Sequence, residues 1–107
     1  MPSPRIADVF PEFRQELESL LLTSKEPELA SQLPDLRIAR RCDCEDDFCA
    51  TFYMPVDRSA EPATEVHCLE LEPQNGMIVL DVASGRITGV EVLYRDDVRS
   101  RLRALFP

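Results

Sequence analysis

Two apolar segments around a tight turn constrain the fold of this chain more than any other feature of its sequence. Residues 77–82 and 86–94 flank Ala83, Ser84 and Gly85. Glycine adopts the positive φ that a short turn between antiparallel strands requires, so the pattern predicts a β-hairpin. Both segments are apolar at successive positions, which is typical of central strands covered on both faces. The hairpin therefore predicts a sheet with these two strands at its centre.

Apolar residues at helical spacing mark the N-terminal third of the chain. The residues that recur at this spacing are Phe10, Phe13, Leu17, Leu20 and Leu21. Pro11 suits the first position of a helix, so we expect a helix over about 11–23. A second short helical segment over 28–33 ends before Pro34.

Three further strands are predicted from β-prone or alternating residues over 37–44, 48–56 and 65–72. An acidic turn at 45–47 joins the first two. The connections are too short for crossover helices, so we expect an antiparallel sheet of about five strands.

A final helix is predicted after the hairpin, capped by Asp96 or Asp97. Its expected buried stripe consists of Val98, Leu102, Leu105 and Phe106. The chain as a whole is expected to form one α+β domain, 1–107, with a helical part over 1–35, an antiparallel sheet over 36–94 and a C-terminal helix over 96–106.

The sequence shows no segment that directs it to a membrane. It lacks a run of about 18 apolar residues, and its first residues lack the pattern of a secretion signal. We therefore expect a cytoplasmic protein with no membrane partner. In that compartment its four cysteines remain thiols or bind metal.

Negative charge is concentrated in residues 43–72. This segment holds nine acidic residues and one basic residue, Arg58, so it accounts for the whole formal net charge of −8. Such a surface repels nucleic acid and attracts a basic protein partner. The residues expected to bind that partner are Glu45, Asp46, Asp47, Asp57, Glu61 and Glu65. The alternative is a solvated surface that only keeps the protein soluble.

Three cysteines, Cys42, Cys44 and Cys49, surround the acidic turn, and His67 and Cys68 follow further along the chain. Zinc takes four thiolate or imidazole ligands, so the three cysteines with either His67 or Cys68 form a candidate structural zinc site. The spacing Cys-x-Cys-x4-Cys resembles the zinc-binding tail of SET-domain methyltransferases over eight residues. This resemblance implies a way to coordinate metal and carries over nothing about enzymatic activity. The alternative, which we expect, is a set of packed thiols without a cofactor.

The register of the hairpin that carries these cysteines separates the two alternatives. A three-residue turn places Cys44 opposite Phe48 and buries Phe52, while Cys49 and Thr51 point to solvent. A four-residue turn places Cys44 opposite Cys49 and brings three sulfurs to one side, but it scatters the apolar residues. Burying a side chain such as Phe52 is worth roughly 2 kcal/mol, so we expect the first register.

No catalytic constellation stands out. His67 is the single histidine, and Cys68 beside it points to the opposite face of a strand. Asp81 and Glu91 are acidic residues within apolar strands; if they share a face, burial raises their pKa values. Their alternative is a place at the wet edge of the sheet or beside an arginine. We therefore expect a non-enzymatic protein, with a small enzyme of unknown reaction as the third alternative.

Residues 76–93 resemble a hairpin of small bacterial proteins of unknown function. The shared pattern is an apolar strand that ends in Asp81, a turn at Gly85, and Arg-Ile-x-Gly followed by Val-Glu-Val-Leu. The resemblance implies a bacterial α+β domain and no assigned reaction. By analogy with small acidic bacterial proteins that block a basic toxin, the chain is expected to be immunity-like.

The leading functional hypothesis is therefore a protein-binding module that acts through the acidic segment 43–72. The zinc-stabilised domain is the second hypothesis. A homodimer is also expected, because apolar strands in so small a domain leave surface to cover.

Overall fold

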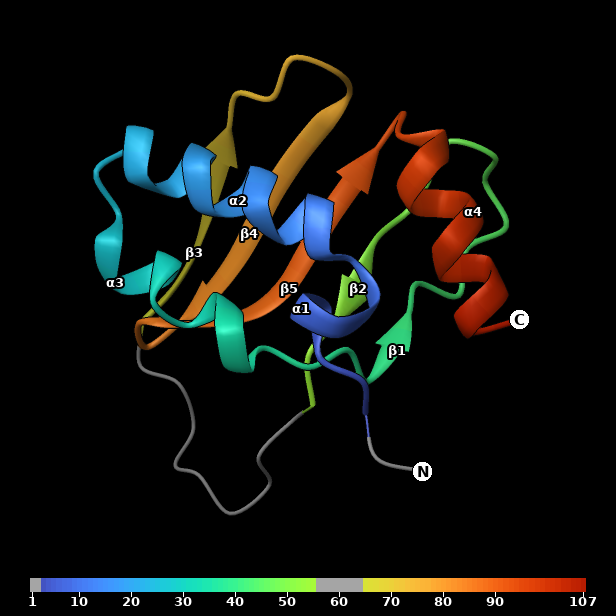
Figure 1. The fold of residues 1–107 in the computed structure, drawn as a ribbon, viewed down its shortest axis with the longest axis horizontal. Helices are drawn as coiled ribbons and strands as arrows, with labels where there is room; N and C mark the ends of the chain where they lie inside the picture. Colours follow the sequence, from blue (N-terminus) through green and yellow to red (C-terminus); the bar gives the residue numbers. More distant parts are fainter. Residues whose placement is uncertain (1–2, 56–64) are drawn as a thin grey trace.

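The computed structural model describes residues 3–55 and 65–107, and it shows a five-stranded antiparallel sheet (Figure 1). The strands are β1 (Arg40–Arg41), β2 (Phe52–Tyr53), β3 (Val66–Leu71), β4 (Met77–Ala83) and β5 (Arg86–Leu93). Their order across the sheet is β1-β2-β5-β4-β3, and every neighbouring pair is antiparallel. The predicted α+β class is confirmed.

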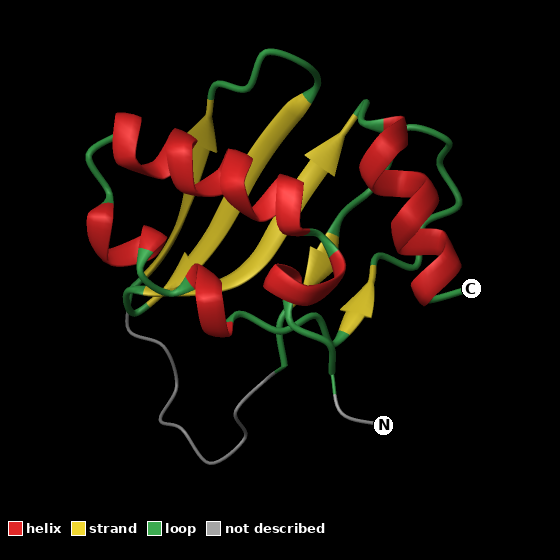
Figure 2. Cartoon of the chain, viewed as in Figure 1, coloured by secondary structure: helices red, strands yellow, loops and turns green. Residues whose placement is uncertain are grey.

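Helices precede and follow the sheet in the sequence and lie on one of its faces (Figure 2). They are α1 (Ile6–Val9), α2 (Pro11–Thr23), α3 (Pro27–Ala30), the 3-10 helix η1 (Leu33–Asp35) and α4 (Asp96–Leu105). Pro11 opens α2 as expected, because the first position of a helix needs no N–H donor. Helix α1 was not anticipated.

The predicted hairpin is present as β4 and β5. Ala83 pairs with Arg86, so the turn contains two residues rather than three. Ser84 and Gly85 have φ values of 50° and 79°, and positive φ at both positions is typical of the tight turn that matches the twist of antiparallel strands.

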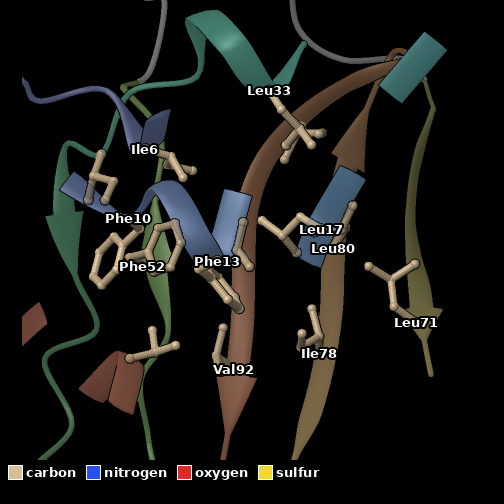
Figure 3. Close-up of a cluster of buried hydrophobic side chains, with 14 of the residues drawn as sticks. Ile6, Phe10, Phe13, Leu17, Leu33, Phe52, Leu71, Ile78, Leu80 and Val92 are labelled. Atoms are coloured by element: carbon tan, nitrogen blue, oxygen red, sulfur yellow. The ribbon is translucent and has the colours of Figure 1, made fainter. Parts of the chain in front are cut away.

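One hydrophobic core joins the helices to the sheet (Figure 3). Phe52 of β2 lies at the centre of an aromatic cluster. Its ring is stacked on that of Phe10, with centroids 6.2 Å apart, and meets Phe13 edge to face at 6.3 Å. Leu17 of α2 packs against the central strands beside Leu80 of β4, and both side chains are fully buried.

The helices cover one face of the sheet, whereas both faces of the central strands were expected to be covered. On the covered face the row Phe52, Val90 and Leu80 runs across β2, β5 and β4. We call the opposite face the outer face. Directly opposed residues share a face, so the row Arg40, Tyr53, Gly89, Asp81 and Cys68 lies on the outer face.

Strands β1 and β2 are much shorter than predicted, with two residues each instead of eight or nine. The chain before β1 is held by the N-terminal segment, where Arg5 bridges to Arg37 and the Ile38 N–H donates to the Pro4 carbonyl at 2.8 Å. The alternation expected from Ile38 onward is therefore interrupted.

Helix α4 begins where expected but is not capped as predicted. Arg95 occupies the N-cap position without a side-chain cap, while Asp96 and Asp97 lie in the first turn. Val98 and Leu102 are buried as expected, but Leu105 is 40% exposed because the helix ends there. Within the described residues, no helix is long and apolar enough to cross a membrane.

Candidate metal centre

The sulfur atoms of Cys42, Cys44 and Cys49 lie within 4.8 Å of one another. Cys49 is buried, with 7% of its surface exposed, and the other two are half-buried. The three thiols come from the loop between β1 and β2. We call them the thiol cluster.

The register of β1 and β2 explains why these sulfurs meet. Arg40 pairs with Tyr53 and Arg41 with Phe52, and this register, continued along the chain, places Cys44 opposite Cys49. It corresponds to the four-residue turn, so the predicted three-residue turn is wrong.

The error comes from a local irregularity before β1. The Ala39 N–H donates to the Tyr53 carbonyl at 2.8 Å, yet Arg40 is the residue aligned with Tyr53. Ala39 and Arg40 thus both lie opposite Tyr53, as two residues of one strand lie opposite one residue of its partner in a β-bulge. The bulge lets Ile38 face the core while Cys42 faces away from it, so burial of apolar residues and convergence of the thiols are compatible.

Cys49 is placed by strand β5. It forms an antiparallel bridge with Leu93, in the same register as the Tyr53–Gly89 pair, which puts its side chain on the outer face. Phe48 is 41% exposed and stacks on Tyr94 with ring centroids 5.4 Å apart.

Arginine side chains hold the backbone of the loop. Arg41 donates to the Cys42 carbonyl at 3.0 Å, and Arg103 of α4 donates to the Cys44 carbonyl at 3.2 Å. These contacts fix two of the three cysteines without using their sulfurs. The thiols are therefore held in place while remaining available to a ligand.

Hydrogen bonds within the cluster favour one thiolate. Burial opposes ionisation of Cys49, but hydrogen bonds from the Thr51 N–H, the Cys44 thiol and the Thr51 hydroxyl hold its pKa below the usual value. The bond that Cys44 donates to Cys49 raises the pKa of Cys44 to about 11. Cys49 is therefore the thiol of the cluster that most readily gives up its proton to become a metal ligand.

Neither His67 nor Cys68, the two alternatives for the fourth ligand of the candidate zinc site, joins the thiol cluster. His67 and Cys68 lie on β3, and β5 and β4 separate that strand from β2. His67 is exposed on this edge strand. The order of the strands in the sheet keeps His67 and Cys68 away from the thiol cluster, and the sequence does not reveal that order.

Cys68 instead meets the two acidic residues of the central hairpin. Ligand atoms of Cys68, Asp81 and Glu91 lie within 4.8 Å of one another, and the Cys68 thiol donates to Asp81 at 3.4 Å. Burial and a hydrogen bond with Asp81 raise the pKa of Glu91, as expected for acids that share a face. Gly89 makes room for this contact, since a Cβ there would lie 2.8 Å from a carboxylate oxygen of Asp81.

The residues predicted to form an acidic face are divided between two regions. Glu45, Asp46 and Asp47 are exposed in the loop of the thiol cluster, and Asp47 lies 3.6 Å from Arg99 of α4. Glu65 is exposed before β3, at the opposite edge of the sheet. Asp57 and Glu61 lie outside the described residues. Binding of a protein through these acids stays a prediction.

Thr51 was expected to face solvent and was not among the predicted site residues. It is 5% exposed, its hydroxyl accepts the Val92 N–H at 3.1 Å, and its carbonyl accepts the Cys42 N–H at 2.8 Å. The one sequence signal was its place two residues after Cys49, since alternate residues of a strand share a face.

The fold and the thiol cluster together define a small α+β protein with a three-thiol site in the loop between β1 and β2. Comparison with protein-family models, with curated proteins and with solved structures finds no match for this chain. The resemblance of residues 76–93 to small bacterial proteins of unknown function stays a prediction.

Proposed function

We propose that this protein binds a thiophilic metal ion, with zinc as the physiological candidate, through Cys42, Cys44 and Cys49. The observation that carries the proposal is the convergence of three sulfurs within 4.8 Å. Sulfur ligands about 2.3 Å from a tetrahedral zinc lie about 3.8 Å apart. A small contraction of the thiol cluster therefore brings the three thiolates to bonding distance.

The chemistry of the donors supports the same choice. Thiolates are soft ligands that select zinc and copper(I) over magnesium or calcium. Cys49 already has a lowered pKa, so less free energy is spent on deprotonating it than on an ordinary thiol. Three thiolates leave one of zinc's four positions to a ligand from outside the cluster.

The ion would stabilise the loop that connects β1 and β2. That loop includes exposed acidic residues and has only short strands on either side. Metal bonds across it would replace the missing strand pairing. A cytoplasmic location belongs to this proposal, because a reducing compartment keeps the thiols free to bind metal.

Metal content and affinity test the proposal. Protein purified under reducing conditions without chelator is analysed for zinc, and its affinity is measured by competition with a chromophoric chelator. We expect about one zinc per chain, and loss of this zinc in Cys44→Ser and Cys49→Ser.

Cys68→Ser is the matched control, because Cys68 is an exposed thiol on the same sheet but outside the cluster. It should retain the zinc of the wild type. A wild-type protein that binds no zinc, or a loss of zinc in Cys68→Ser alone, would contradict the proposal.

A further inference from the structure

Thr51 is the one polar residue buried in the part of the chain that the structure describes. A buried hydroxyl costs free energy unless its hydrogen bonds are made. In the sequence Thr51 lies between Cys49 and Phe52. In the structure it contacts strand β5 next to the thiol cluster. Its hydrogen bonds therefore indicate the structural role of this side chain.

The hydroxyl of Thr51 replaces a backbone acceptor in the sheet. The Ala50 N–H donates to the Val92 carbonyl at 2.8 Å, and a regular antiparallel pair would return the Val92 N–H to Ala50. The Val92 N–H donates instead to the Thr51 hydroxyl oxygen, at 3.1 Å. This bond fixes the side chain and leaves the hydroxyl proton for another acceptor.

The candidate acceptor for that proton is the sulfur of Cys49, which lies two residues earlier on the same face of the sheet. The backbone carbonyl of Thr51 accepts the Cys42 N–H at 2.8 Å. Thr51 thus links the backbone of Cys42 to the central strand β5, and its side chain shares a face with that of Cys49.

We propose that Thr51 is a positioning residue of the metal centre, which orients the Cys49 sulfur and ties the thiol cluster to β5. The inference rests on the proposed metal-binding function. Hydrogen bonds from residues behind the ligands orient them, and losing one such partner commonly weakens metal binding by about 10- to 100-fold. Thr51 meets this description through both its hydroxyl and its backbone.

Replacing the hydroxyl with a methyl group tests the inference. Thr51→Val keeps the shape and the backbone bonds, and we expect its zinc affinity to fall by about 10- to 100-fold. Thr51→Ser keeps the hydroxyl and should bind within about threefold of the wild type. Thr88→Val is the matched control, because Thr88 is an exposed threonine whose hydroxyl donates to the Asp81 carbonyl at 3.2 Å; it should bind like the wild type.

Cobalt(II) in place of zinc separates positioning from a merely structural role. Loss of a hydrogen bond to a coordinated sulfur shifts the sulfur-to-cobalt charge-transfer band, so Thr51→Val should shift it and Thr51→Ser should not. A variant that is only less stable in urea, with unchanged band and affinity, overturns the inference while wild-type metal binding stands. A wild type that binds neither metal overturns both proposals.

Discussion

Glu91 is an acidic residue whose place in the sheet opposes its ionisation. It is half-buried beside Asp81, and within the described residues neither carboxylate has an ion-pair partner. The burial and the shared hydrogen bond raise its pKa above the ordinary 4.5. The folded protein thus holds this proton more tightly than the unfolded chain does.

This difference predicts a pH-dependent gain in stability for Glu91→Gln. Between 4.5 and the raised pKa, the unfolded chain releases the proton first, so wild-type stability falls as pH rises. The variant cannot ionise at this position. Its gain in stability over the wild type is therefore smallest below pH 4.5 and reaches a plateau above the pKa that Glu91 has in the folded protein. Each unit of pKa shift corresponds to about 1.4 kcal/mol.

Urea unfolding between pH 4 and pH 8 measures this effect. Glu70→Gln, which removes an exposed carboxylate from β3 on the same face, is the control and should show no such trend. A stability difference for Glu91→Gln that shrinks with rising pH would show that the sign is wrong.

An ion pair joins helix α2 to Arg95, the N-cap residue of helix α4, which lies far along the sequence. Both nitrogens at the end of Arg95 donate to Glu16 at 2.7 Å, and Arg95 also contacts Asp97 at 3.1 Å. The side chain of Arg95 is only 10% exposed. A two-point bond of this kind is stronger than a surface pair because solvent screens it less.

We therefore expect Glu16→Gln to lower the free energy of unfolding by about 1 to 2 kcal/mol. Glu18→Gln on the same helix removes a more exposed pair with Arg14 and should cost less than about 0.5 kcal/mol. Chemical denaturation at neutral pH compares the two. Equal losses would indicate that the α2–α4 connection adds nothing beyond surface charge.

How well each element could be predicted depended on how local its determinants are. The hairpin of β4 and β5 was predictable because Gly85 and the apolar runs lie next to each other. The register at the thiol cluster was not, because the bulge at Ala39 depends on the pairing of residues 37 and 38 with the N-terminal segment. Arg103, far along the chain, also holds that loop.

Both groups of potential metal ligands lie on the same side of the molecule. Helices cover one face of the sheet (Figure 2). The strand register places Cys49 of the thiol cluster and the group of Cys68, Asp81 and Glu91 on the outer face. The sequence contained all of these residues but not the strand order. Strand order separated Cys68 from the other cysteines and joined it to the acids.

Metal binding should stabilise the molecule as a whole. An ion that binds only the folded state adds about 2.7 kcal/mol when its free concentration is 100 times Kd. We expect zinc to raise the Tm of the wild type and of Cys68→Ser but not of Cys49→Ser, measured by circular dichroism in the presence of a reductant. An equal rise in all three proteins would place the ion elsewhere.

X-ray absorption at the zinc edge tests the thiol cluster as the metal centre most directly. The zinc-loaded wild type should show a shell of three sulfurs at about 2.3 Å, and Cys49→Ser should lose part of that shell. A first shell of nitrogen and oxygen alone, at about 2.0–2.2 Å, would contradict it.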